Sequence, residues 1–298
     1  MTTSFLKQVL CITIGLILCQ CQPPADNSGS RSNDVKPATE AASRPRSTKS
    51  TGSKNNDKRI ATPATEASSS SADSIPRGAK LLIKAYPDSH LKYANNKIIF
   101  PDGTAIRYDD GQRKNFKQQL DNSDIEDMFA TPYRKTGRPA YLEDVGRSRC
   151  ELLFKKMYGN SAAMVRHNLV TIDWFGQKIQ FTKVNGAAKN LKAVANEVAR
   201  HPEYRKYLKS SGTFYWRKVR GANRQSAHSY GIAFDVGVQY SDYWLWKNPD
   251  KSETDKIAYY NKMPLGLVKI FERHGFIWGG RWYHFDTMHF EYRPELLL

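Results

Sequence analysis

The sequence predicts an α+β fold, on three observations. Two segments, residues 96–110 and 169–182, show the alternating and β-branched pattern of paired strands. Residues 186–211 begin with the spacing of an amphipathic helix. Strand-like and helix-like segments follow one another without regular alternation, which favours antiparallel hairpins mixed with helices over a doubly wound parallel sheet.

The first half of this folded region begins near residue 78. We expect a strand at residues 79–86, followed by a hairpin over residues 96–110 that turns at Asp102 and Gly103. Residues 111–130 and 147–159 have helical spacing of apolar side chains.

In the second half of the folded region, we expect a hairpin at residues 169–182, with Phe175 and Gly176 at its turn. A helix follows from residue 186, and its apolar face ends at the break expected before Pro202. Residues 213–219 are expected to form a strand, and residues 289–293 the final strand. Between these strands, residues 263–280 contain a helix with Pro264 in its first turn and Gly275 at its C-terminal cap.

Residues 1–21 are expected to be a signal peptide, because the apolar run at residues 9–18 is shorter than the roughly 20 residues that span a bilayer. Cysteines close this run, as in a bacterial lipoprotein signal, so Cys19 or Cys21 is the candidate lipidation site. An ordinary cleaved signal is the alternative. We therefore expect an exported protein, anchored to a lipid membrane and facing the periplasm or the cell surface.

Residues 22–76 are rich in Ser, Thr, Ala, Pro and charge and have almost no large apolar side chain, so they are expected to be a flexible linker. Residues 77–150 are then an N-terminal extension of hairpin and helix, and residues 151–298 the main domain. Only Cys150 of the four cysteines lies in the folded region, which excludes an internal disulfide and a zinc site of several cysteines. The net charge of +17 favours polyanionic surroundings such as nucleic acid, anionic lipid or an acidic wall polymer.

The sequence predicts a metal site with histidine and carboxylate ligands. A catalytic zinc site takes three such ligands and a nearby carboxylate as general base. His228 and Asp235 are seven residues apart, and His289 follows Asp286 by three. His284 competes with His289 for the third ligand position, because spacing alone does not separate them.

A longer pattern carries a family resemblance. It consists of Ser226-x-His228-x-x-Gly231-x-Ala233-x-Asp235 and, about fifty residues later, Asp286-x-x-His289-Phe290. This pattern resembles the VanY-like D-alanyl-D-alanine carboxypeptidases, a zinc peptidase family that includes L-alanyl-D-glutamate endopeptidases. The resemblance covers roughly residues 151–298, and it implies the Hedgehog/DD-peptidase fold, with a central antiparallel sheet and flanking helices.

The resemblance also implies the site. His228, Asp235 and His289 are the expected ligands of one zinc ion, Asp286 the general base, and Arg217 the oxyanion stabiliser, with Arg220 close by. Ser226 is expected to hold the loop or to meet the polar end of the substrate.

The implied substrates are peptidoglycan stem peptides. Aspartate at position 286, where carboxypeptidases commonly have glutamate, is more typical of the endopeptidase branch, so the cleaved bond stays open. The alternative function is a non-catalytic, zinc-containing module that binds the cell wall. A nucleic-acid partner is not expected, because only the net charge supports it and the export signal argues against it.

The aromatic side chains at residues 243–246 and 278–283 are expected to pack in the core and at its rim. The alternative is that they form a wall that binds the substrate.

Overall fold

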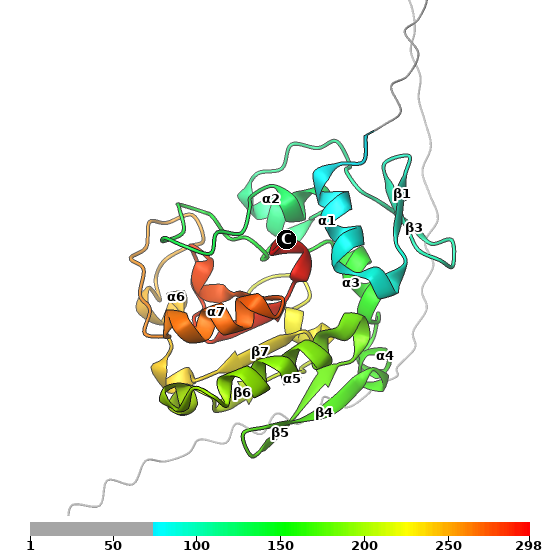
Figure 1. The fold of residues 1–298 in the computed structure, drawn as a ribbon. Helices are drawn as coiled ribbons and strands as arrows, with labels where there is room; N and C mark the ends of the chain where they lie inside the picture. Colours follow the sequence, from blue (N-terminus) through cyan, green and yellow to red (C-terminus); the bar gives the residue numbers. More distant parts are fainter. Residues whose placement is uncertain (1–73) are drawn as a thin grey trace, which may run out of the picture. The chain divides into compact units, whose positions relative to one another are not determined.

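The computed structural model describes residues 74–298 (Figure 1). The predicted signal peptide, the linker up to residue 73 and both candidate lipidation cysteines, Cys19 and Cys21, lie outside the described residues. The α-helices are α1 (Arg77–Ala85), α2 (Phe116–Asp121), α3 (Glu151–Tyr158), α4 (Ala162–His167), α5 (Ala187–Val198), α6 (Trp244–Lys247) and α7 (Leu265–Arg273). The strands are β1 (Lys92–Ala94), β2 (Lys97–Ile99), β3 (Ala105–Arg107), β4 (Leu169–Trp174), β5 (Gln177–Thr182), β6 (Ser210–Gly212), β7 (Ala233–Val236), β8 (Phe276–Trp278) and β9 (His289–Tyr292).

The strands form three antiparallel sheets, which confirms the α+β class. The largest has four strands in the order β6-β7-β9-β8, and the other two are β1-β2-β3 and the hairpin β4-β5. In the largest sheet, β7 and β9 are the central strands, with Phe234 opposite Phe290 and Asp235 opposite His289. Helices α5 and α7 lie along this sheet (Figure 1).

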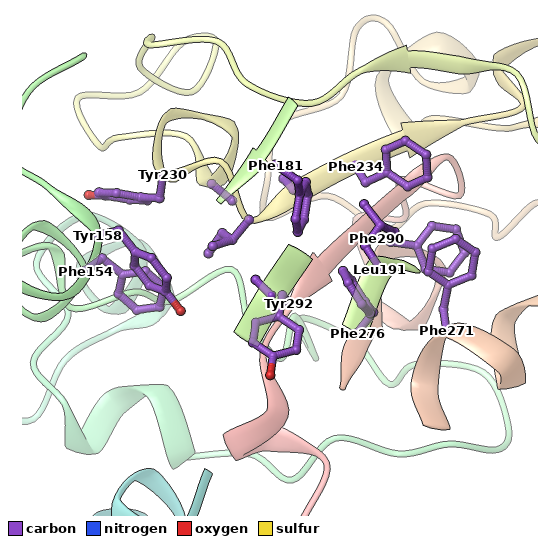
Figure 2. Packing of buried hydrophobic residues seen from close by; sticks show 14 of the residues in the cluster. Phe154, Tyr158, Phe181, Leu191, Tyr230, Phe234, Phe271, Phe276, Phe290 and Tyr292 are labelled. Atoms are coloured by element: carbon purple, nitrogen blue, oxygen red, sulfur yellow. The ribbon is translucent and has the colours of Figure 1, made fainter. Parts of the chain in front are cut away.

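The alternation of side chains along β7 and β9 separates a core face from a polar face. Phe234 and Phe290 belong to the core, where the rings of Phe290 and Phe271 of α7 stack with their centroids 3.9 Å apart. Figure 2 shows these rings beside Leu191 of α5 and Phe276 of β8. Asp235 and His289, one residue along each strand, therefore project from the opposite face of the sheet.

Several predicted elements are confirmed. The β4-β5 hairpin turns at Phe175 and Gly176, which both have positive φ (48° and 85°), as a tight two-residue hairpin turn requires. Helix α5 ends at Val198, before Pro202, and Gly275 follows α7 with a φ of 86°. The helix predicted at 147–159, the hairpin at 96–110 and the last strand are also present.

Two predicted strands are wrong. Residues 79–86 fall mostly in helix α1, whose buried residues Gly78, Ala79 and Leu82 have helical spacing. The first buried position has no room for a side chain, because a Cβ on Gly78 would lie 2.5 Å from the ring of Phe129. A short, mostly apolar segment of eight residues fits the periodicity of either a helix or a strand. Here α1 packs against the C-terminal turn at Pro294–Leu296, and this contact favours the helix (Figure 1).

Residues 213–219 do not form a strand of any sheet; only Lys218 makes an isolated bridge, with Gln225. The backbone of this segment is held instead by the turn at Ala227–Tyr230. The Tyr215 N–H donates to the His228 carbonyl (3.3 Å), and the Arg217 N–H donates to Ser229 Oγ (2.9 Å).

The helix predicted at 111–130 is shorter than expected. It consists of α2, capped by Asn115, and a 3₁₀ turn at Glu126–Phe129. None of the helices within residues 74–298 is long and apolar enough to span a membrane.

Candidate metal centre

Three of the sequence-predicted residues converge on the polar face of the central sheet. Asp235 and His289 are paired residues on the neighbouring strands β7 and β9, and His228 comes from the 3₁₀ turn that precedes β7. One ligand atom from each of the three lies within 4.8 Å of the others. The seven-residue spacing of His228 and Asp235 therefore corresponds to a turn followed by a strand.

The ring of His228 is oriented by the backbone. Its Nδ1 lies 2.6 Å from the carbonyl oxygen of Thr213, so that nitrogen is the donor and Nε2 stays free to accept. Nε2 faces the Asp235 carboxylate, 3.2 Å from Oδ2. A histidine whose second nitrogen donates to a carbonyl is the usual arrangement of a metal ligand.

Gly231 lets the chain pass from the turn into β7. It has a φ of 66°, and an added Cβ would lie 2.6 Å from the Leu169 side chain. Glycine is therefore required at this position by the left-handed turn and by the close contact with β4.

His289 meets the same carboxylate from the other strand. Its Nδ1 lies 3.0 Å from Asp235 Oδ1, while its Nε2 points the other way, 3.6 Å from Glu291 Oε2. Burial alone would lower the pKa of His289, but hydrogen bonding to Asp235 raises it to about 10. The two imidazoles in turn hold the pKa of Asp235 well below its usual range, against the effect of burial. This point of the molecule therefore attracts positive charge, and two imidazole nitrogens with one carboxylate are a donor set that suits zinc.

Asp286 lies in the same cavity as the three ligand candidates. The His289 N–H donates to the Asp286 carbonyl (3.2 Å), so the D-x-x-H spacing closes one turn and brings both side chains to one side. Asp286 Oδ1 is buried and has no hydrogen-bond partner among residues 74–298. Burial, and then repulsion from Asp235, raise the pKa of Asp286 to about 6. A carboxylate with a raised pKa beside a metal site has the properties of a general base.

His284 is not part of the cluster of ligand atoms. Its Nδ1 lies 2.6 Å from Asp144 Oδ2, and its backbone N–H donates to Oδ1 of the same carboxylate (2.9 Å). The ring packs edge-on against Trp244 and lines the cavity, and its buried Nε2 has no partner among the described residues. The geometry therefore favours His289 as the third ligand and gives His284 a different position, facing the cavity. Asp144 is 140 residues away in sequence, and no motif could have identified it.

The cavity has a volume of about 360 Å³ and is lined by the remaining predicted site residues. Ser226 is a buried part of the wall, and Arg217 and Arg220 line it from exposed positions. Neither arginine forms an ion pair within residues 74–298, so both are available to an anionic group. The structure does not separate the two as candidates for the oxyanion stabiliser.

The aromatic side chains divide between the two expected roles. Trp278 is fully buried in the core, and Trp244 and Trp282 are 5% and 6% exposed, although both also line the cavity. Trp246 also lines the cavity but is 56% exposed. Packing is therefore the main role, and Trp246 is the aromatic side chain most open to a substrate.

Two other acidic clusters have ligand atoms at similar separations, formed by Asp109, Asp110, Asp124, Glu126 and Asp127. The ammonium group of Lys114 lies among them, 2.9 Å from Asp110, 3.1 Å from Asp124 and 2.6 Å from Asp127. This buried cation already pairs with three of the five carboxylates, which favours structural ion pairs over a metal site here.

Comparison with known proteins gives a family match over the segment that contains these residues. Residues 220–292, which contain His228, Asp235, Asp286 and His289, match the model of a family described as D-alanyl-D-alanine carboxypeptidase. Arg217 lies before the matched residues. No curated protein and no solved structure matches the chain. Over residues 220–292, the match confirms the resemblance to the VanY-like carboxypeptidases that the sequence pattern predicts.

Proposed function

We propose that this protein is a zinc-dependent peptidase that hydrolyses peptide bonds in peptidoglycan stem peptides. The family match supports a peptidase of the D-alanyl-D-alanine carboxypeptidase type. The single observation that carries the proposal is the convergence of His228, Asp235 and His289 at one point of a cavity that also contains Asp286. The Hedgehog/DD-peptidase fold is part of this proposal, supported by the antiparallel sheet whose central strands hold two of the ligands.

His228 Nε2, the Asp235 carboxylate and His289 Nδ1 are the atoms that would hold the metal. Bound there, a zinc ion supplies a Lewis acid that polarises a substrate carbonyl and makes water a nucleophile near neutral pH. Two histidines and one carboxylate leave a further position open, as a catalytic zinc site requires.

Asp286 moves the proton in this mechanism. Its carboxylate accepts a proton from the attacking water and then delivers it to the nitrogen of the leaving amine, so one group acts first as base and then as acid. The buried, unpartnered Oδ1 suits this role, because it has no competing hydrogen bond within the described residues.

The other polar groups of the cavity bind and orient the substrate. Arg217 or Arg220 neutralises the negative charge that develops on the carbonyl oxygen, and Ser226 hydrogen-bonds to the polar end of the peptide. The Nε2 of His284, held in place by Asp144, offers a further hydrogen bond to the substrate from the lining of the cavity.

The cellular setting of the proposal rests on the sequence. An export signal with lipidation at Cys19 or Cys21 would place the domain beside the cell wall, and the net charge of +17 suits an anionic polymer there. Both D-alanyl-D-alanine carboxypeptidase and L-alanyl-D-glutamate endopeptidase activity are compatible with this site.

The test is digestion of purified muropeptides by the zinc-loaded protein, with mass spectrometry of the products and a parallel measurement of zinc content. We expect one zinc ion per chain and loss of a terminal D-alanine or cleavage within the stem peptide. Stoichiometric zinc with unchanged muropeptides would sink the peptidase proposal and leave the non-catalytic wall-binding module.

A further inference from the structure

Glu291 lies directly behind the third ligand candidate. It follows His289 by two residues on β9, so its side chain projects from the same face of the sheet. The residue is completely buried, and its Oε2 lies 3.6 Å from His289 Nε2, the nitrogen that faces away from Asp235. Glu291 is therefore placed to contact the ring on the side opposite to the metal.

Both oxygens of this carboxylate are fixed by arginines. Arg149 Nη1 lies 3.2 Å from Oε2, and Arg293 Nη1 donates to Oε1 (3.1 Å). The same two Nη1 atoms also donate to the Gly146 carbonyl, at 3.0 and 3.1 Å. Because both oxygens are paired with guanidinium groups, the carboxylate is placed to act as a hydrogen-bond acceptor.

The ion network continues away from the metal centre. Arg293 Nε donates to Glu295, whose other oxygen accepts from the Tyr86 hydroxyl just after α1. Glu295 is as deeply buried as Glu291, but the only side chains within residues 74–298 that it pairs with are Arg293 and Tyr86. Three groups of this network, on Tyr86, Gly146 and Arg149, come from residues 77–150, outside the segment that matches the peptidase family.

We propose that Glu291 is a positioning residue of the metal centre, which accepts a hydrogen bond from His289 Nε2–H and so presents Nδ1 to the metal, and that residues 77–150 hold it there. Metal-bound histidines usually donate their second N–H to a carboxylate or a carbonyl, which sets the tautomer and makes the ring a stronger ligand. The present separation of 3.6 Å is longer than a hydrogen bond, and it is expected to shorten when the metal binds. The inference rests on the metal centre of the proposed function and gives a role to the N-terminal extension.

The test compares Glu291→Gln with the matched control Glu295→Gln. Each change removes one buried negative charge from the same network, but only the first touches His289. The zinc dissociation constant of the metal-free protein is measured by competition with a chelator, and circular dichroism checks the fold. Glu291→Gln should weaken zinc binding by about 10–100-fold, the usual effect of losing such a partner, whereas Glu295→Gln should keep the wild-type affinity. Wild-type affinity in Glu291→Gln, or equal losses in both variants, would overturn the proposal.

A measurement on the wild-type protein keeps the proposal testable if Glu291→Gln does not fold. Long-range ¹H–¹⁵N spectra of the zinc-loaded protein report which ring nitrogen of His289 carries the proton. We expect the proton on Nε2, and a proton on Nδ1 would refute the role of Glu291. If the wild-type protein binds no zinc, the metal centre itself is refuted. If zinc binding depends on Glu291 but the protein has no peptidase activity, only the proposed function is refuted.

Discussion

Replacing Asp286 with asparagine should stabilise the metal-free protein at pH 8. The Asp286 carboxylate is partly buried close to the negative charge of Asp235, and its Oδ1 has no hydrogen-bond partner in the described structure. Its pKa is raised from 3.8 to about 6 in the fold. A shift of roughly 2 units at about 1.4 kcal/mol each gives an upper bound of about 3 kcal/mol for the cost of the ionised group. Because the residue is partly exposed, we expect a gain of about 1–3 kcal/mol in the free energy of unfolding.

The sign of the pH dependence follows from the direction of the shift. The folded-state pKa lies above the unfolded one, so the ionised carboxylate destabilises the fold fully above about pH 6 and not at all below about pH 4. The advantage of Asp286→Asn should therefore be greatest at pH 8 and disappear as the pH falls toward 4.

The assay is urea unfolding of chelator-treated protein at pH 8 and pH 4.5, with Asp173→Asn as the control. Asp173 is an exposed carboxylate whose pKa is lowered by its hydrogen bond to Lys178, so its replacement should not stabilise the protein at either pH. The same Asp286→Asn protein should bind zinc normally and lose peptidase activity by about 10²–10⁴-fold, since it lacks the base. Equal or lower stability than the wild type at pH 8 would refute the reasoning on Asp286.

Three further predictions test other parts of the site. His289→Ala should lose stoichiometric zinc whereas His284→Ala should retain it, as measured by metal analysis after dialysis; normal zinc binding by His289→Ala would return His284 as a ligand. Gly231→Ala should lower the free energy of unfolding by at least about 1–2 kcal/mol, because the residue has a φ of 66° and a Cβ would collide with Leu169; urea unfolding at the wild-type value would contradict this strain. Trp246→Ala should leave the melting temperature unchanged and raise KM for muropeptides, whereas Trp282→Ala should lower the melting temperature because that ring is buried; unchanged kinetics in Trp246→Ala would remove this side chain from the substrate site.

The sequence alone was enough to identify the ligand candidates and the elements with local signals. The hairpin turn at Phe175 and Gly176 and the end of a helix before Pro202 depend on local backbone preferences, and both were predicted correctly. His228, Asp235, Asp286 and His289 belong to short motifs with specific spacing, which correspond to one turn before β7 and one turn before β9. Local structure places His228 near Asp235 and Asp286 near His289, so the spacing within each motif was enough to identify these residues as site candidates.

Tertiary structure decided the features that depend on contacts between distant segments. The strand predicted at residues 79–86 is a helix because Ala79 and Leu82 pack in the core formed with distant segments, and a short apolar run does not encode that contact. The geometry that favours His289 over His284 as the third ligand depends on strand register, which pairs His289 with Asp235, and on Asp144, which binds His284 from 140 residues away. One of the two arginines that fix Glu291, Arg149, likewise lies 142 residues away in sequence. The spacing of residues in the sequence indicates which side chains share a turn or a strand. The partners of a buried charge depend instead on the packing of the whole chain, because a buried carboxylate is stabilised by a cation that can come from any distant segment.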